Sequence, residues 1–121
     1  MLYLAKRFEA AVRELVGDGP IKQRLGSAYG RHLEDLAIPD LPEPLRGRFE
    51  ALHGALHRVP PMGKQRSLDV TVRKMSFAEA SSHAETIVEL YAEVLRNSDR
   101  YEPLKVVRSE EPRQQRIASG R

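Results

Sequence analysis

The apolar residues of this sequence recur at intervals of three and four residues in four separate stretches, a spacing that predicts amphipathic α-helices. Glycine or proline interrupts the pattern at residues 17–20, 38–39 and 60–61, where helices end or begin. Because the connections are short, consecutive helices should run antiparallel. We therefore expect an all-α fold, a small antiparallel bundle of four main helices. These helices span about residues 2–16, 20–36, 42–58 and 76–96.

The apolar stripe of each helix identifies the residues that we expect in the core. On the first three helices the stripes are Leu4, Phe8, Ala11, Val12 and Leu15; Ile21, Leu25, Ala28, His32 and Leu36, flanked by Tyr29 and Leu33; and Leu45, Phe49, Leu52 and Leu56. Aromatic residues make up only 6% of the sequence, and tryptophan is absent. The core should therefore be modest and built mainly from leucine, valine and alanine.

The fourth helix has the clearest start, because Ser76 and Glu79 have the capping-box spacing, in which each side chain satisfies a backbone N–H of the first turn. Its apolar face comprises Phe77, Ala80, Ala84, Val88, Tyr91 and Leu95, widened by Ile87, Leu90 and Val94. This face spans roughly 160°, wider than the ~100° stripe of a simple surface helix. The width predicts contact with two neighbouring helices, or with one neighbour and a partner molecule.

Two further stretches lack a clear helical pattern. In the first, Leu68, Val70 and Val72 alternate as in a strand, whereas Leu68, Val72 and Met75 have helical spacing. Because an isolated strand is not stable, we expect a loop and then a short extra helix over residues 67–74. From residue 98 onward the apolar spacing fails, which predicts a flexible charged tail. The predicted organisation is a helical domain at residues 1–97 and a tail at residues 98–121.

Composition excludes several classes of protein. The sequence has no cysteine, so it has neither disulfides nor cysteine-based metal or catalytic sites. No stretch approaches the ~20 apolar residues of a membrane span. A secretory signal begins with positive charge and continues with about 7–15 apolar residues, whereas here a short uncharged stretch precedes Lys6 and Arg7. We therefore expect a cytoplasmic protein that needs no cofactor and does not associate with membranes.

The four histidines do not form a recognisable catalytic or metal site. His53 and His57 have the i, i+4 spacing that can place two imidazoles on one metal ion, with Glu50 one turn earlier, but no third ligand of matching geometry is evident. His32 falls within an apolar stripe, where we expect a hydrogen bond to a tyrosine rather than a catalytic role. No nucleotide-binding, hydrolase or zinc-protease motif occurs. The sequence therefore predicts neither an enzyme nor a metal site.

Charge is distributed unevenly along the chain. Residues 58–75 carry five cations and one carboxylate, a net +4, and residues 76–97 carry a net −3. The five cations are Arg58, Lys64, Arg66, Arg73 and Lys74. Basic patches bind phosphate backbones, but this segment contains no aromatic residue on which a base could stack. The patch is therefore either a nucleic-acid site or a solvated loop that pairs with the glutamates of the last helix.

Gly26 and Gly30 lie one turn apart on the second predicted helix, away from its apolar stripe and on the side of Ala37. A glycine inside a helix costs about 1 kcal/mol relative to alanine, so the pair costs about 2 kcal/mol. We expect another backbone to approach closely along Gly26, Gly30 and Ala37, either within the chain or from a partner. Simple tolerance of glycine on an exposed face is the alternative.

Together these features favour a non-enzymatic helical interaction module that docks on a protein partner or self-associates. The wide apolar face of the last helix and the glycine strip are the basis of that hypothesis. The alternative hypothesis is a nucleic-acid-associated protein that binds the phosphate backbone through residues 58–74 and the basic tail.

Overall fold

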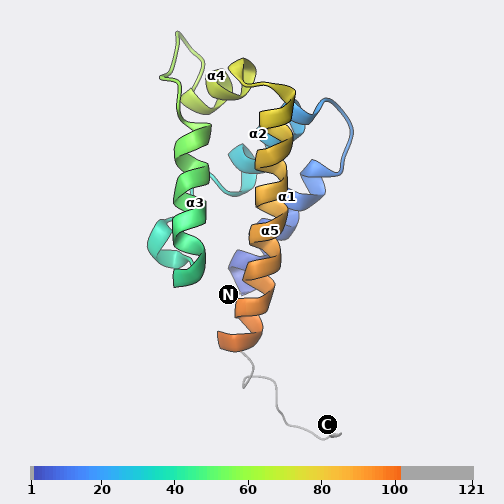
Figure 1. The fold of residues 1–121 in the computed structure, drawn as a ribbon, viewed down its shortest axis with the longest axis vertical. Helices are drawn as coiled ribbons and strands as arrows, with labels where there is room; N and C mark the ends of the chain where they lie inside the picture. Colours follow the sequence, from blue (N-terminus) through green and yellow to red (C-terminus); the bar gives the residue numbers. More distant parts are fainter. Residues whose placement is uncertain (1, 102–121) are drawn as a thin grey trace, which may run out of the picture.

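The computed structural model describes residues 2–101, and within that range the chain forms five α-helices and one short 3₁₀ helix (Figure 1). The helices are α1 Leu2–Leu15, α2 Ile21–His32, η1 Ile38–Asp40, α3 Glu43–Leu56, α4 Ser67–Lys74 and α5 Phe77–Tyr101. The all-α class is confirmed, and the extra helix lies at residues 67–74 as predicted. None of the helices within residues 2–101 is long and apolar enough to span a bilayer.

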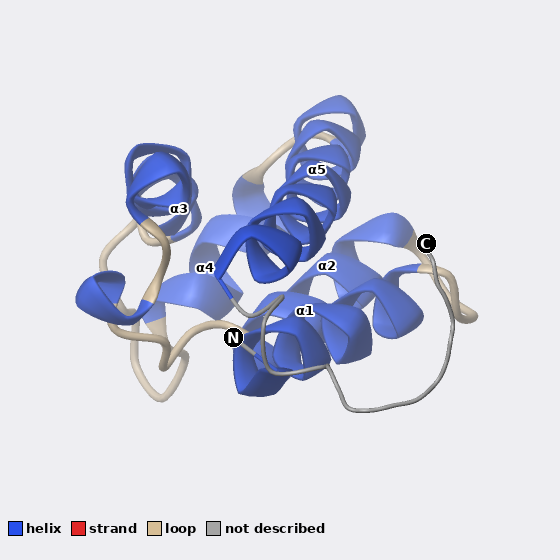
Figure 2. Cartoon of the chain, turned by 90° about the horizontal axis from the view of Figure 1, so that it is seen from below, coloured by secondary structure: helices blue, strands red, loops and turns tan. Residues whose placement is uncertain are grey.

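The helices are arranged around α5. α1 and α2 form an antiparallel hairpin, and α5 packs against both of them (Figures 1 and 2). α3 also packs against α5, while α4 crosses one end of the molecule and contacts both α2 and α3. The predicted contact of the last helix with two neighbours is therefore an underestimate, because α5 contacts three helices.

Arg24 holds the turn between α1 and α2. Its guanidinium donates hydrogen bonds to the main-chain carbonyl oxygens of Leu15, at 2.6 Å, and Gly19, at 2.8 Å. The carbonyl of Leu15 is one of those that a helix leaves unpaired at its C-terminal end. Gly19 has a φ of 101°, in the left-handed region that favours glycine. These contacts fix the direction in which α2 returns along α1.

The centre of the core is a set of three aromatic rings from three helices. The ring centroid of Phe49 lies 6.2 Å from that of Phe8 and 6.2 Å from that of Tyr29, and all three residues are fully buried. The predicted stripes surround them, with Leu4, Ala11, Leu15, Leu25, Ala28, Leu33, Leu45, Leu52 and Leu56 all buried. The helical periodicity therefore identified most of the core of the first three helices, whereas the predicted stripe residues Val12, Ile21, His32 and Leu36 are only partly buried.

α4 is enclosed on more than one side, which explains its ambiguous sequence pattern. Leu68, Val70 and Val72 are all buried, although residues two apart point in different directions on a helix. The hydroxyl of Thr71, which is fully buried, accepts a hydrogen bond from the N–H of Val59 at 2.9 Å. This contact ties α4 to the loop that follows α3.

α5 begins with the predicted capping box. The N–H of Glu79 donates to Oγ of Ser76 at 3.0 Å, and the N–H of Ser76 donates to Oε1 of Glu79 at 3.1 Å. The N–H of Ser76, and after it the guanidinium of Arg58, lower the pKa of the Glu79 carboxyl. The start of α5 is therefore fixed by its own side chains.

The predicted centre of the apolar face of α5 is only partly right, because Ala80 and Ala84 are buried but three other members are not. Phe77, Val88 and Leu95 are 67%, 47% and 44% exposed, whereas Ile87, Leu90 and Val94, predicted at the edge, are fully buried. The three neighbouring helices pack on the side of Ile87, and this choice cannot be read from a helical wheel. The predicted end near Arg96 is also too early, because α5 continues to Tyr101. The rest of the predicted tail, residues 102–121, lies outside the described residues.

α2 ends at His32 instead of near Leu36 as predicted. The N–H of Glu34 bonds to the carbonyl of Tyr29 at 2.8 Å, so the last turn is wider than an α-helical turn. Leu33 is fully buried in the core just after this point. The wide turn therefore marks the end of α2 directly before this buried residue.

The predicted tyrosine partner of His32 is also wrong. Nε2 of His32 lies 3.2 Å from Oε2 of Glu14 on α1, and the carbonyl of His32 accepts a hydrogen bond from Arg7 at 2.7 Å. His32 therefore links the two helices of the hairpin at the edge of the core, where a carboxylate can reach it.

Candidate functional site

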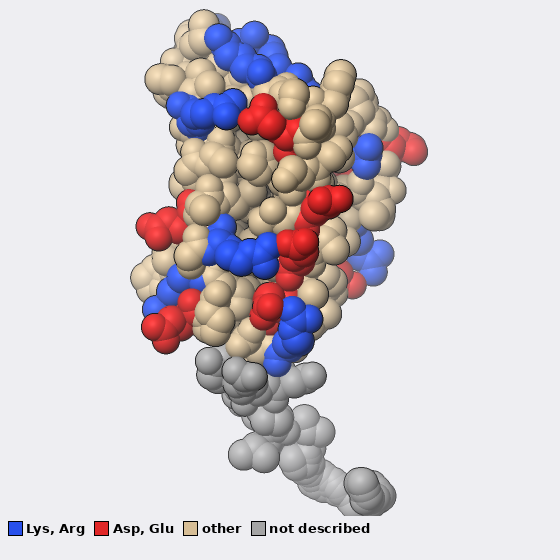
Figure 3. Space-filling view, viewed as in Figure 1, with Lys and Arg blue, Asp and Glu red and all other residues tan. Residues whose placement is uncertain are grey.

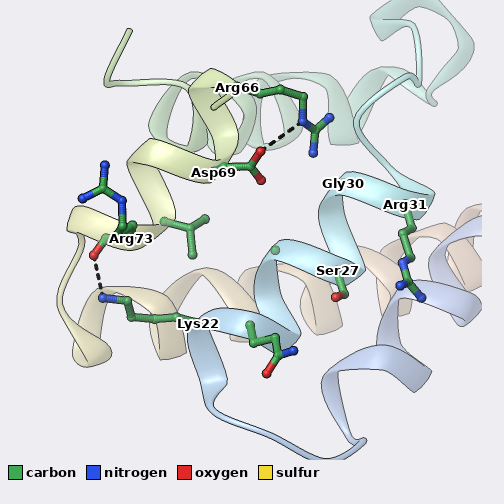
Figure 4. Close-up of a pocket in the computed structure, with 10 residues that line it drawn as sticks. Lys22, Ser27, Gly30, Arg31, Arg66, Asp69 and Arg73 are labelled. Carbon is green, nitrogen blue, oxygen red and sulfur yellow. Dashed lines mark hydrogen bonds and ion pairs between the residues drawn. The ribbon is translucent and has the colours of Figure 1, made fainter. Parts of the chain in front are cut away.

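A cleft of about 430 Å³ lies between α2 and α4 and combines the two surface features that the sequence singles out. Figure 4 shows Lys22 and Arg73 at one end and Arg31 at the other, with Arg66 and Asp69 projecting from the α4 side. Four cations thus surround a cleft that contains one carboxylate. The lining residues are Lys22, Gln23, Gly26, Ser27, Gly30, Arg31, Arg66, Asp69, Val72 and Arg73.

The two glycines of the predicted strip have different surroundings. A Cβ atom on Gly30 would lie 3.1 Å from Cδ2 of Leu68 and 3.4 Å from Nη2 of Arg66, so α4 approaches α2 closely at this position. A Cβ atom on Gly26 would meet nothing within 4 Å. Ala37 is exposed in the loop before η1, and therefore does not continue the strip. Gly30 permits the contact between the helices, and Gly26 leaves the adjacent floor of the cleft open.

The five predicted cations are divided between the cleft and its surroundings. Arg66 and Arg73 line the cleft, whereas Arg58, Lys64 and Lys74 do not. Arg58 donates to Oε2 of the capping residue Glu79 at 3.3 Å, as expected if the basic loop pairs with the last helix. Figure 3 shows Lys and Arg gathered at the end of the molecule that α4 and the preceding loop form.

Lys22 and Arg31 were not predicted as site residues, because they lie far from residues 58–74 along the chain. Both line the cleft from α2. A signal for Lys22 was present, because residues 22, 26 and 30 follow one another at intervals of four and share a helix face. Lys22 precedes Gly26 and Gly30 on this helix face, so the face carries a positive charge.

In the ion pairs around the cleft the arginines are exposed, whereas their partners Glu34 and Glu14 are only 23% and 29% exposed. Arg66 contacts Glu34 at 2.9 Å and Asp69 at 3.3 Å, and its side chain is 59% exposed. The hydrogen bond to Asp69, followed by the charge of Glu34, raises the pKa of Arg66, which remains charged. Arg31 contacts Glu14 at 3.3 Å, and its side chain is 70% exposed. Surface pairs of this kind contribute about 0–1 kcal/mol each.

Chemically, the cleft is suited to anions. Guanidinium groups present several N–H donors in a plane that matches the oxygens of a phosphate. Arg31, Arg66 and Arg73 supply three such groups, and the hydroxyl of Ser27 adds a neutral donor on the α2 side. This arrangement contains no paired nucleophile and base.

Behind the cleft, Glu34 connects Arg66 to a pair of stacked histidines. Oε2 of Glu34 lies 2.7 Å from Nε2 of His57, whose ring stacks on that of His53 with centroids 4.1 Å apart. Burial, and after it the neighbouring His57, lower the pKa of His53, which also contacts the hydroxyl of Tyr29. Burial raises the pKa of Tyr29. This network supports the Arg66 side of the cleft from within.

The predicted i, i+4 histidine pair thus serves in hydrogen bonding. His57 uses both ring nitrogens, because Nδ1 contacts the carbonyl of His53 at 2.8 Å and Nε2 contacts Glu34. Among the residues that the structure describes, no three His, Asp or Glu side chains gather as they would around a metal ion.

Comparison of this chain with known protein families, with curated proteins and with solved structures gives no match.

Proposed function

We propose that this chain is a non-enzymatic binding protein whose cleft between α2 and α4 holds the phosphate backbone of nucleic acid. The supporting observation is that Lys22 and Arg31 of α2, Arg73 of α4 and Arg66 just before α4 converge on one cleft, of whose lining residues only Asp69 is a carboxylate. Such clusters bind phosphates by releasing the counterions that surround nucleic acid. The cytoplasm, where nucleic acid is accessible, is the proposed location.

The existing contacts of these cations do not prevent this role. The side chains of Arg31 and Arg66 are mostly exposed, and their carboxylate partners stabilise the fold only weakly. Phosphate oxygens can therefore reach the exposed guanidinium groups while Glu14 and Glu34, which are 29% and 23% exposed, stay beside them. Gly26 adds space, because no atom lies within 4 Å of the position of its missing Cβ.

The test is the binding of labelled single-stranded and duplex oligonucleotides to two matched triple variants, measured by fluorescence anisotropy. The first variant neutralises the cleft with Arg31→Gln, Arg66→Gln and Arg73→Gln. Lys22 is retained because its ammonium also bonds to the carbonyls of Arg73 and Met75, at 2.8 and 3.0 Å. We expect this variant to lose most of its affinity at low salt.

The control variant removes the same charge elsewhere, with Lys6→Gln, Arg48→Gln and Arg96→Gln. None of these residues lines the cleft, and Arg48 and Arg96 pair with glutamates on α5. We expect near wild-type affinity. Equal losses in the two variants would mean that only net charge matters, and the cleft would then not be the site.

A third variant, Gly26→Leu, separates binding from folding. Leucine is a good helix former and the position is open, so the fold should be at least as stable as that of the wild type. The side chain would occupy the floor of the cleft and should block a phosphate backbone. Unchanged affinity in this variant would contradict the proposed place of binding.

A second candidate function is self-association through an apolar groove, because a specific surface supports the interaction-module hypothesis. The groove lies where Leu15, Val16, Ile21 and Val88 meet, and Val16 is 77% exposed. Arg24, Glu85 and Glu89 also line this groove, so a second copy bound there would bring charges of both signs to the interface. Sedimentation of the wild type and of Val88→Glu tests this candidate. A monomer at high concentration would exclude it.

A further inference from the structure

Phe77 is an aromatic residue that the fold leaves exposed. It is the first residue of α5, and 67% of its surface is accessible, although the sequence pattern predicts it in the core. The capping contacts between Ser76 and Glu79 hold the backbone on either side of it. The ring is therefore presented to solvent from a fixed position.

Lys22 connects this ring to the cleft. Its ammonium lies 5.3 Å from the ring centroid of Phe77, a cation–π distance. The same ammonium bonds to the carbonyls of Arg73 and Met75, at 2.8 and 3.0 Å, and Lys22 lines the cleft. The aromatic ring and the proposed phosphate site thus share one side chain and form a continuous surface.

Phe77 supplies an aromatic ring beside the cleft, whereas the basic segment itself contains no aromatic residue. Proteins that bind single strands combine a basic groove, which follows the backbone, with aromatic side chains on which bases stack. In a duplex the faces of the bases are already stacked on one another and are inaccessible to Phe77. A single strand can place its phosphates in the cleft and turn one base outward.

We infer that the chain prefers single-stranded nucleic acid, with one unpaired base stacked on Phe77 beside Lys22 while neighbouring phosphates lie between α2 and α4. This inference rests on the proposed function and adds the class of nucleic acid to it. Stacking on a phenylalanine tolerates every base, so the expected sequence preference is weak.

The experiment compares the full chain with Phe77→Ala and Phe77→Trp on a labelled single strand, the matching duplex and inorganic polyphosphate. Loss of one stacking contact should lower the affinity of Phe77→Ala for the single strand by about 5- to 150-fold, with duplex and polyphosphate binding unchanged. Leu95→Ala, which truncates another exposed apolar residue of α5, should bind as the wild type does.

Phe77→Trp provides a direct optical signal, because the natural sequence has no tryptophan. It should keep the affinity for the single strand, and its fluorescence should be quenched when a base stacks on the indole. The matched reporter Leu95→Trp lies on the same helix away from the cleft and should not be quenched.

Each outcome supports or overturns the inference. Equal binding of single strand, duplex and polyphosphate, with no effect of Phe77→Ala, would overturn it while leaving the proposed phosphate site intact. Failure of the wild type to bind any of the three at low salt would overturn the proposed function as well. Selective loss of single-strand affinity in Phe77→Ala, together with quenching in Phe77→Trp, would establish it.

Discussion

Replacing Gly26 and Gly30 by alanine, one at a time, tests the geometry on which the cleft depends. Both glycines lie within α2, so both variants gain the difference in helix propensity between alanine and glycine. Only one of them faces a packed neighbour. The two substitutions should therefore have different effects on stability, although they are chemically identical.

The contacts give the expected magnitudes. Alanine at position 26 meets nothing within 4 Å, so the variant should gain about 0.5–1 kcal/mol in free energy of unfolding. Alanine at position 30 would place its Cβ 3.1 Å from Cδ2 of Leu68, which is 1% exposed and has little room to move. Overpacking of this kind costs about 1–3 kcal/mol. Gly30→Ala should therefore be less stable than Gly26→Ala by about 1–3 kcal/mol.

Thermal and urea unfolding, followed by far-ultraviolet circular dichroism, measure this difference. A gain of about 1 kcal/mol raises the melting temperature by about 4–8 °C in a folded unit of this size. Gly47→Ala and Gly54→Ala are the controls, because these glycines of α3 also have open surroundings. Equal stabilisation by Gly26→Ala and Gly30→Ala would refute the close approach of α4 to α2.

Three further predictions concern the core, a buried hydroxyl and pH. Phe49→Ala should cost about 3–5 kcal/mol, measured by urea unfolding, because its fully buried ring contacts two other aromatic rings; a loss below about 1 kcal/mol would mean that α3 does not pack as described. Thr71→Val should cost about 1–3 kcal/mol in the same assay, because the N–H of Val59 loses its acceptor. Burial lowers the pKa of His53 below its ordinary value of 6.5, so the unfolded chain binds that proton more readily than the folded chain. The stabilisation by the neutral His53 ring should be complete above pH 6.5 and should decrease as the pH falls below it. The decrease should be smaller in His53→Gln. Identical pH profiles of stability for the variant and the wild type would contradict the lowered pKa of His53.

The fold could be predicted well wherever local chemistry determines it. The stripes centred on Phe8, Leu25 and Phe49 are buried because removal of an apolar helix face from water is favourable. The capping box at Ser76 forms because both partners lie within four residues of each other. Such features need no knowledge of the rest of the molecule.

Other features depend on how the helices meet in space. The wheel of α5 is apolar over a wide arc, and only the positions of its three neighbours decide that Ile87 is buried and Phe77 is exposed. The end of α2 at His32, directly before the buried Leu33, is likewise not indicated by local propensity.

Only part of the candidate site could be predicted, because the rest depends on how the helices pack. Arg66 and Arg73 belong to a basic run that is visible in the sequence, and the glycines of α2 were recognisable by their cost in a helix. That these two features face each other across one cleft follows only from the packing of α4 on α2. The exposed ring of Phe77 beside Lys22 likewise required the folded structure.

The salt dependence of single-strand binding is the most direct test of the proposed site. Four cations, each in contact with one phosphate, give a slope of about −2.8 in a plot of log affinity against log salt, or about a 50-fold loss between about 50 and 200 mM. Only Lys22 remains in the Arg31, Arg66 and Arg73 triple variant, so its affinity should fall about 3-fold over the same range. Identical slopes for the variant and the wild type would contradict the account, because the phosphates would then contact other residues.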